Sequence, residues 1–529
     1  MGRLRAGSRE AMIDRDAPGR TSGPAVEGAA AVPGRRGTGR WDALAALRAP
    51  WVLVALGAIL VGALVLRAWD LGQVDERAGE VLTEERARGP WGDAIRSMAE
   101  PRNQGPLYYL MLRVLPGDDV TALRIPSVVL GVLAVGLLVA FVAVVFRDRG
   151  LALWSGLLLA VSPLHVLLSR LARPYGLLVV LSLLVTAAFL ALVSGRRGAW
   201  WWGGFVALSA LAYLTHFTAL VLPVAQALVL LVRRPGRPLW WRWSAAQALA
   251  LTPLAAWVAY SLGQTRDPSE GSIPGPTLAT VPRAVWNLLV GAGIDTGAWM
   301  TPAIVLATVG LAGGVVWGIR HRDVGAATML ALVAAASIPT FIAVLTITTK
   351  YSDRYLAVAL PAFMILVAAG WTRTGFARVG VVALAVIVAS AAVVSARSTF
   401  GDREPGEDWS GAARVVGAEA GAGDLVVFQR STTRRAFEDA SPSGADPPFE
   451  VVELDATADT TADERRAEDV WVVYRNPIED FHTGAYRDFT PLEPGLSEMS
   501  DWLIARRERI VDERVLEGMR IFRLRPEGS

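Results

Sequence analysis

The stretch "SVVLGVLAVGLLVAFVAVVF", residues 127–146, decides the fold class. It holds no charged residue, and it is about as long as the roughly 20 apolar residues that an α-helix needs to cross a bilayer. Similar runs recur along the chain. Because 53% of the 529 residues are apolar, only 19% are charged and the mean hydropathy is +0.39, we predict a polytopic α-helical membrane protein.

The apolar runs predict about eleven transmembrane helices. We expect them near residues 50–69, 126–146, 151–168, 175–193, 199–215, 217–232, 243–262, 299–319, 324–346, 355–371 and 376–396. The protein is therefore expected to be a multi-pass protein of the cell (plasma or inner) membrane.

The arginines indicate how the chain is oriented. Five loops between predicted helices are basic: residues 147–150, 194–198, 233–243, 320–323 and 372–378. They all fall on the same side as the Arg-rich N-terminal residues, and basic loops stay on the cytoplasmic side of a membrane. We expect a cytoplasmic N-terminus and a first span that is an uncleaved anchor. The net charge of +3 and the pI near 9.4 reflect this placement, so no nucleic acid partner is expected.

Three regions follow from this topology. Residues 1–48, rich in Gly, Ala, Arg and Pro, are predicted to be a disordered Arg-rich cytoplasmic tail. Residues 49–397 are predicted to form the transmembrane domain, with a long first extracytoplasmic loop at 70–125. An odd number of spans leaves residues 398–529 outside, where short apolar strands and a helix at 407–421 predict a small soluble α/β domain.

Polar side chains from four separate segments converge on the outer face in this topology. They are Asp75 and Glu76; His165, Arg170, Arg173 and Tyr175; Tyr213 and His216; and Lys350, Tyr351, Asp353 and Arg354. Each of these residues taken alone can be explained without a functional role. An arginine or lysine can extend its charge to the lipid headgroups, a tyrosine can belong to the aromatic belt at the membrane interface, and an acid can be solvated in a loop. For the site to have no function, all of these separate explanations would have to be true at once on the same face. Polar groups gathered at membrane depth instead usually mark a functional site.

This set of residues suits one kind of chemistry. Outer-face cations can hold the phosphate of a lipid headgroup, and a carboxylate can take a proton from an attacking hydroxyl. A phosphate is a competent leaving group when cations hold its charge. The residues therefore predict transfer of a group from a lipid phosphate to an acceptor hydroxyl outside the cell. The absence of cysteine excludes disulfides and thiolate catalysis, and no spacing of residues implies a metal.

The order of the motifs resembles the GT-C superfamily of glycosyltransferases that use polyprenyl-phosphate sugars. It is most similar to bacterial family 39 enzymes of the protein O-mannosyltransferase and aminoarabinose transferase branch. The motifs, in chain order, are the acid pair in "GQVDERAGEVL", then "GPLYYLMLR", "LRIPSVVLGVLAV", "SRLARPYG", "LTHFTALVLP", "DRYLAVALPAF" and "EDWSGAARVV". The resemblance covers residues 51–429.

The resemblance implies roles for individual residues. Asp75 would be the general base of a single inverting displacement, with Glu76 holding the acceptor or orienting the loop. Arg173 and either Lys350 or Arg354 would hold the lipid phosphate. The full expected set of substrate-binding residues is Tyr108, His165, Arg170, Arg173, Tyr175, His216, Lys350, Tyr351 and Arg354.

The donor implied by the family is a polyprenyl-phosphate sugar, carrying a mannose-like residue or another hexose or pentose. The acceptor would be a hydroxyl of a protein, a glycan or a lipid, and no further cofactor is implied. Two positions depart from the family pattern and put the acceptor contacts in question: Gly105 stands where a proline is usual, and Leu171 stands where an acid is frequent.

Two other functions remain open from the residues alone. A lipid-substrate transporter or flippase would predict acids at the bilayer midplane and an inverted repeat, and the sequence shows no repeat. A non-catalytic envelope assembly protein would use its outer domain for binding. Substitution of Asp75 by Asn separates these alternatives from a glycosyltransferase.

Overall fold

The structure is a computed structural model of residues 1–529. It describes residues 49–72, 78–99, 104–115, 117, 119–196, 198–263, 288, 298–321, 323–346, 353–373, 377–400, 407–429, 431–441, 448–454, 461–475, 498–516 and 518–526. The chain divides into two compact units, residues 1–39 and 40–529, and every described residue lies in the second. The predicted tail at 1–48 lies outside the described residues.

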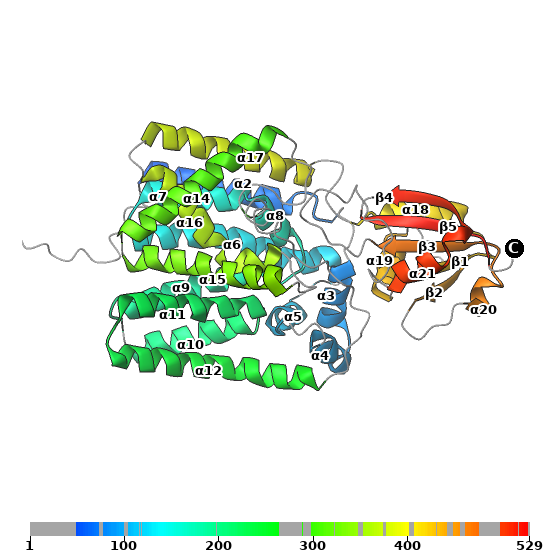
Figure 1. Ribbon diagram of the computed structural model, residues 1–529, viewed down its shortest axis with the longest axis horizontal. Helices are drawn as coiled ribbons and strands as arrows, with labels where there is room; N and C mark the ends of the chain where they lie inside the picture. Colours follow the sequence, from blue (N-terminus) through cyan, green and yellow to red (C-terminus); the bar gives the residue numbers. More distant parts are fainter. Residues whose placement is uncertain are drawn as a thin grey trace, which may run out of the picture. The chain divides into compact units, whose positions relative to one another are not determined.

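The first part of this unit is helical (Figure 1). Its elements are α2 (Pro50–Ala68), α3 (Ala78–Arg88), α4 (Trp91–Ala99), α5 (Leu107–Arg113), α6 (Val120–Phe146), α7 (Arg149–Val161), α8 (Pro163–Arg170), α9 (Tyr175–Val193), α10 (Ala199–Tyr213), η2 (Phe217–Leu220), α11 (Val221–Arg233), α12 (Arg237–Leu262), η3 (Ala298–Met300), α14 (Thr301–His321), α15 (Val324–Thr346), η4 (Asp353–Ala359), α16 (Leu360–Thr372) and α17 (Ala377–Phe400). Figure 1 shows the long helices side by side, with the short helices α3, α4 and α5 at one end of the bundle. The prediction of a polytopic helical bundle is confirmed.

Each of the eleven predicted spans overlaps a helix, but fewer helices are long enough to cross a bilayer unaided. Among the described residues, seven helices have the required length and composition: Pro50–Ala68, Val120–Phe146, Tyr175–Val193, Arg237–Leu262, Thr301–His321, Arg354–Thr372 and Arg378–Phe400. An eighth span is a bent pair, α7 and α8, with an angle of 57° between the two helices. Another predicted span is the shorter apolar helix 217–233, and within the 23-residue helix α15 the apolar stretch found by the same test covers 324–337.

The bend between α7 and α8 explains one of these differences. Ser162 interrupts the helix, and Pro163 has no backbone N–H to continue the hydrogen-bond ladder. The hydroxyl of Ser162 instead accepts a hydrogen bond from the His165 N–H at 3.4 Å, which starts a new helix. Hydropathy alone reads the two short helices as one continuous span.

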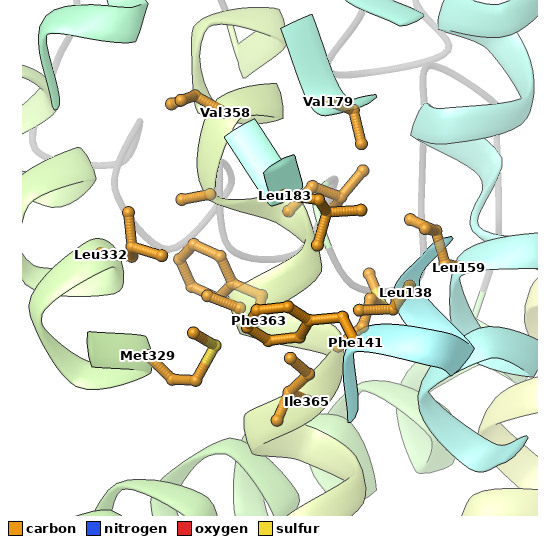
Figure 2. Packing of buried hydrophobic residues seen from close by; sticks show 14 of the residues in the cluster. Leu138, Phe141, Leu159, Val179, Leu183, Met329, Leu332, Val358, Phe363 and Ile365 are labelled. Atoms are coloured by element: carbon orange, nitrogen blue, oxygen red, sulfur yellow. The ribbon is translucent and has the colours of Figure 1, made fainter. Parts of the chain in front are cut away.

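The core of the bundle lies between α6, α7, α9, α15 and α16. Figure 2 shows Phe141 of α6 beside Phe363 of α16, with Leu183 and Met329 packed around them. Helix α16 is buried over nearly its whole length, since 83% of its apolar window is inside the protein. This burial explains why its sequence is apolar on every face.

Helices α14 and α16 approach closely because small residues line their contact. A Cβ added at Gly370 would lie 1.8 Å from the carbonyl oxygen of Gly310, and one added at Gly314 would lie 2.0 Å from that of Leu366. Without a side chain at these positions the two backbones pack directly against each other, as is common between membrane helices.

The C-terminal part contains a five-stranded mixed sheet. Its elements are α18 (Trp409–Glu419), β1 (Leu425–Phe428), α19 (Ser431–Asp439), β2 (Glu450–Glu453), α20 (Thr461–Glu464), β3 (Val470–Arg475), α21 (Glu498–Ala505), η5 (Arg507–Arg509), β4 (Ile510–Leu516) and β5 (Met519–Leu524). The strand order is β2-β1-β3-β5-β4, with β2, β1 and β3 parallel and β5 antiparallel to both β3 and β4. The predicted small α/β region is therefore present.

The burial of the strands explains which of them the sequence indicates. All four residues of β1 are buried, and five of the six in β3, as expected for strands covered on both faces. The edge strand β4 was not predicted, because "IVDERVL" is largely exposed and its polar centre reads as a loop.

Candidate active site

The predicted site residues divide into described and undescribed positions. Asp75, Glu76, Lys350 and Tyr351 lie outside the described residues, so their roles stay predictions. The other substrate-binding candidates fall into two groups. One group surrounds His216, and the other lies at the break between α7 and α8.

His216 is the centre of an aromatic cluster formed by three separate segments. Its ring centroid lies 5.5 Å from that of Tyr175, 5.6 Å from that of Tyr355 and 5.0 Å from that of Phe217. His216 and Tyr175 are almost completely buried. The start of α9, the turn before η2 and the start of η4 therefore meet at one point, as the predicted convergence requires.

Two arginines act on this cluster. Burial, and then the positive charges of Arg173 and Arg354, lower the pKa of the His216 imidazole to about 3. The same two guanidinium groups act electrostatically on the phenol of Tyr175. At neutral pH His216 is therefore uncharged, and two cations from distant parts of the sequence act on the same two aromatic side chains.

The tautomer of His216 follows from its hydrogen bonds. The Thr218 N–H donates to His216 Nδ1 at 3.3 Å, so Nδ1 is an acceptor and we assign the proton to Nε2. His216 Nε2 is buried and has no hydrogen-bond partner among the described residues. The ring thus presents one N–H donor whose orientation is fixed by the turn that leads into η2.

The turn at 214–216 is joined to the start of α5. The Gly105 N–H donates to the Thr215 carbonyl at 3.1 Å, and the Leu107 N–H donates to the Leu214 carbonyl at 3.1 Å. A Cβ at position 105 would lie 1.8 Å from the Leu214 carbonyl oxygen. A proline here would clash with that carbonyl and would lose the donated bond. The departure from the family pattern at Gly105 is therefore required by this close approach.

Tyr108 supports the segment that carries Arg173. Its hydroxyl lies 2.7 Å from Ser127 Oγ, and the Ser127 hydroxyl donates to the Arg173 carbonyl at 3.4 Å. Tyr108 is fully buried. The Tyr108 hydroxyl is therefore connected to the backbone of Arg173 through the hydroxyl of Ser127.

The second group stabilises the helix break. Arg67 of α2, which the sequence analysis missed, is fully buried and donates to the carbonyls of Ala160 at 2.9 Å and Leu159 at 3.3 Å. The end of a helix leaves such carbonyls without intrahelical donors. Arg67 Nη2 also lies 2.7 Å from His165 Nδ1. An arginine inside an apolar span was the signal that could have identified this residue.

Other residues complete the same structure. Arg170 donates to the Trp69 carbonyl at 2.7 Å, just beyond the end of α2. From α17, the Ser395 hydroxyl donates to the Val161 carbonyl at 2.8 Å, and the Thr399 hydroxyl donates to the Leu66 carbonyl at 3.2 Å. His165 and Arg170 thus lie among bonds that hold the helix break.

A buried ion pair was also missed. Arg124 of α6 and Glu80 of α3 are each 1% exposed and form two bonds, from Nε at 3.0 Å and from Nη2 at 2.7 Å. Glu80 Oε1 also accepts the Ala172 N–H at 2.7 Å. Hydropathy does not indicate this pair, because Glu80 lies in a polar stretch of the predicted first extracytoplasmic loop. No cluster of three or more metal-ligating side chains occurs in the described part of the chain.

The comparisons with known proteins concern the family and the fold. A family model described as dolichyl-phosphate-mannose-protein mannosyltransferase matches residues 106–260, which include Tyr108, Arg173, Tyr175 and His216. A search of curated protein sequences gives no significant match.

Solved structures of similar fold cover most of the chain. ArnT from Cupriavidus metallidurans bound to undecaprenyl phosphate has a TM-score of 0.51 at 15% identity, covering 89% of this chain and 98% of ArnT. Its apo structure has a TM-score of 0.50 at 14% identity, with 89% and 97% covered. The oligosaccharyltransferase AglB from Archaeoglobus fulgidus, in complex with an inhibitory peptide and a dolichol-phosphate, has a TM-score of 0.50 at 11% identity, with 80% and 70% covered. The chain therefore shares the fold of these proteins, as the motif order predicted.

Proposed function

We propose that this protein is a membrane glycosyltransferase that moves a sugar from a polyprenyl-phosphate carrier to an acceptor hydroxyl outside the cell. The observation that carries the proposal is the meeting of Tyr175, His216 and Tyr355 from three separate segments. The positive charges of Arg173 and Arg354 both act on the buried, uncharged His216. The fold shared with ArnT and AglB supports it, and so does the family model at 106–260.

The side chains of Arg173, Arg354 and His216 suit the binding of a phosphate group. Guanidinium groups match the planar geometry of phosphate oxygens and hold their charge. The Nε2–H of His216 is a buried donor that has no acceptor among the described residues, and a phosphate oxygen would supply one. One ArnT structure holds undecaprenyl phosphate, which supports a lipid phosphate as the occupant here.

The proposed reaction is a single displacement. Asp75 takes the proton from the acceptor hydroxyl, and the hydroxyl oxygen attacks the anomeric carbon of the sugar. The bond from that carbon to the phosphate oxygen breaks, and the configuration inverts. The electron pair leaves with the polyprenyl phosphate, whose charge Arg173 and Arg354 stabilise, together with Lys350 if it faces the same pocket. Glu76 would hold the acceptor or orient the loop.

The remaining parts of the proposal concern topology and substrates. The enzyme would lie in the plasma or inner membrane with residues 1–48 in the cytoplasm, the bundle at 49–397, and 398–529 outside. The sugar would be a hexose or pentose, and the acceptor a protein, a glycan or a lipid. AglB binds an inhibitory peptide in its structure, which supports a protein acceptor as one of these.

The first test compares strains that lack this protein, or express variants of it, by mass spectrometry of their envelope glycans and glycoproteins. We expect one hexose or pentose to be missing from an envelope component in the deletion strain and in the Asp75→Asn strain, at normal protein levels. Glu85→Gln is the matched control, because its side chain is 39% exposed on the helix that follows the acid pair. Full product from Asp75→Asn would remove Asp75 as the base.

The second test measures binding of undecaprenyl phosphate to the purified protein in detergent. Arg173→Ala and Arg354→Ala should each weaken this binding, because each removes one cation from the pocket. Asp75→Asn should leave it unchanged. Equal affinity in all variants would show that the two arginines do not hold the carrier.

A further inference from the structure

Arg124 bonds to the chain on both sides of the predicted acid pair. Its Nη1 donates to the Leu71 carbonyl at 2.9 Å, just before the segment that contains Asp75 and Glu76. Its Nε and Nη2 donate to Glu80, just after that segment. One guanidinium group therefore holds the two ends of residues 72–79.

We propose that Arg124 and Glu80 form a clamp that positions the general base relative to the phosphate-binding cation. The proposal rests on the proposed function. Neither residue would touch the reacting atoms, so both are positioning residues. Because the guanidinium group is planar and rigid, the Leu71 carbonyl and the Glu80 carboxylate are fixed relative to each other. These two groups flank the segment that contains the predicted base in the sequence.

The same carboxylate reaches the other half of the site. Glu80 Oε1 accepts the N–H of Ala172, and the next residue is Arg173. Arg173 is held from its other side through its own carbonyl, which accepts from Ser127. Glu80 thus connects the segment of the predicted base directly to the backbone of a cation beside His216.

The burial of the pair distinguishes it from an ordinary surface ion pair. Exposed pairs contribute little and tolerate loss of one partner. Here both side chains are 1% exposed, so removal of either breaks a buried bidentate ion pair, which is far more destabilising than loss of an exposed one. A pair of this kind fixes one geometry, and reacting groups misplaced by about 1 Å can lose roughly 100-fold in rate.

Substitution of Glu80 by Gln separates the two bonds of the carboxylate. The Gln side chain keeps an oxygen that can accept the Ala172 N–H, but it no longer pairs with the charge of Arg124. We therefore expect Glu80→Gln to lower kcat about 100-fold while the KM for the donor changes little. Glu80→Ala removes both bonds and should also raise the KM for the donor. Glu85→Gln, on the same helix, should change neither value.

Hydrogen–deuterium exchange tests the clamp without using activity. In Glu80→Gln, amides in peptides covering 72–79 should exchange faster, while those in α16 should be unchanged. Arg124→Lys provides a second variant, because it keeps a positive charge near Glu80 but cannot also reach Leu71 through a forked group. It should give the same pattern of exchange if Glu80→Gln does not fold.

The outcomes separate the clamp from the proposed function. Unchanged exchange at 72–79 in both variants would overturn the clamp, whatever the enzyme does. Faster exchange in α16 as well would also overturn it, because the pair would then stabilise the whole bundle. If the exchange pattern is as expected but Asp75→Asn keeps full activity, the clamp would exist and the assignment of the base would fail. Loss of kcat together with selective exchange at 72–79 would support both.

Discussion

Gly105→Ala tests the contact that joins α5 to the turn before η2. The added Cβ would lie 1.8 Å from the Leu214 carbonyl oxygen, whereas ordinary carbon–oxygen contacts are about 3.3 Å. The two backbones must therefore separate by about 1.5 Å. Overpacking of this kind costs about 1–3 kcal/mol. The hydrogen bonds to Thr215 and Leu214 would also weaken, at about 1 kcal/mol each.

The total predicted loss is about 3–5 kcal/mol of folding free energy. The assay is thermal unfolding in detergent, followed by the fluorescence of the 19 tryptophans. Because the turn carries His216, binding of undecaprenyl phosphate should weaken as well. The melting temperature should therefore fall, and the carrier should bind less tightly at a temperature where the variant is still folded.

Gly92→Ala is the matched control for this prediction. Gly92 lies in helix α4, and a Cβ added there would meet no heavy atom within 4 Å. Alanine is about 1 kcal/mol better than glycine inside a helix, so this variant should melt at the same temperature or higher. A Gly105→Ala protein that melts like Gly92→Ala and binds the carrier normally would refute the reasoning.

Two further predictions concern buried basic residues. The folded-state pKa of His216, about 3, lies below its ordinary value near 6.5, so the unfolded chain binds an extra proton between these values. Stability should therefore fall as the pH is lowered through this window, and His216→Gln should melt with a weaker dependence on pH from 7 to 4; parallel curves for the two proteins would contradict this. Arg67→Met should lower the melting temperature more than Arg67→Lys, because methionine cannot donate to the buried carbonyls of Leu159 and Ala160. Each carbonyl left without a donor should cost about 1–3 kcal/mol of folding free energy. A Met variant as stable as the parent would show that the bonds are dispensable.

The helical fold could be predicted because a bilayer imposes a simple rule on sequence. Residues 127–146 carry no charge, and α6 is a single helix through this stretch. The count of long spans could not be predicted in the same way. Hydropathy does not register the break at Pro163 or the 3-10 turn that precedes α11, because the only polar residues at these two places, Ser162 and Thr218, are uncharged.

The sequence could predict that candidate site residues lie near one another only where the count of spans places their segments on the same face of the membrane. Tyr175 and His216 come from segments placed on one face by the count of spans, and the structure brings their rings together. Arg173 and Arg354, from segments on the same predicted face, act electrostatically on His216. The Glu80–Arg124 pair was not predictable, because a glutamate in a polar helix gives no sign that tertiary packing will bury it. The roles of Asp75, Glu76, Lys350 and Tyr351 stay predictions.

The bonds from α17 to α2 and to the end of α7 have a consequence for biosynthesis. Ser395 and Thr399 donate to carbonyls of Val161 and Leu66, residues that are synthesised far earlier. If the helices enter the membrane in chain order, these two carbonyls cannot receive the hydrogen bonds from Ser395 and Thr399 until α17 has been inserted. A chain that stops before α17 would lack these two hydrogen bonds to α2 and to the end of α7. The membrane's quality-control proteases would thus have a chemical difference by which to tell an unfinished bundle from a complete one.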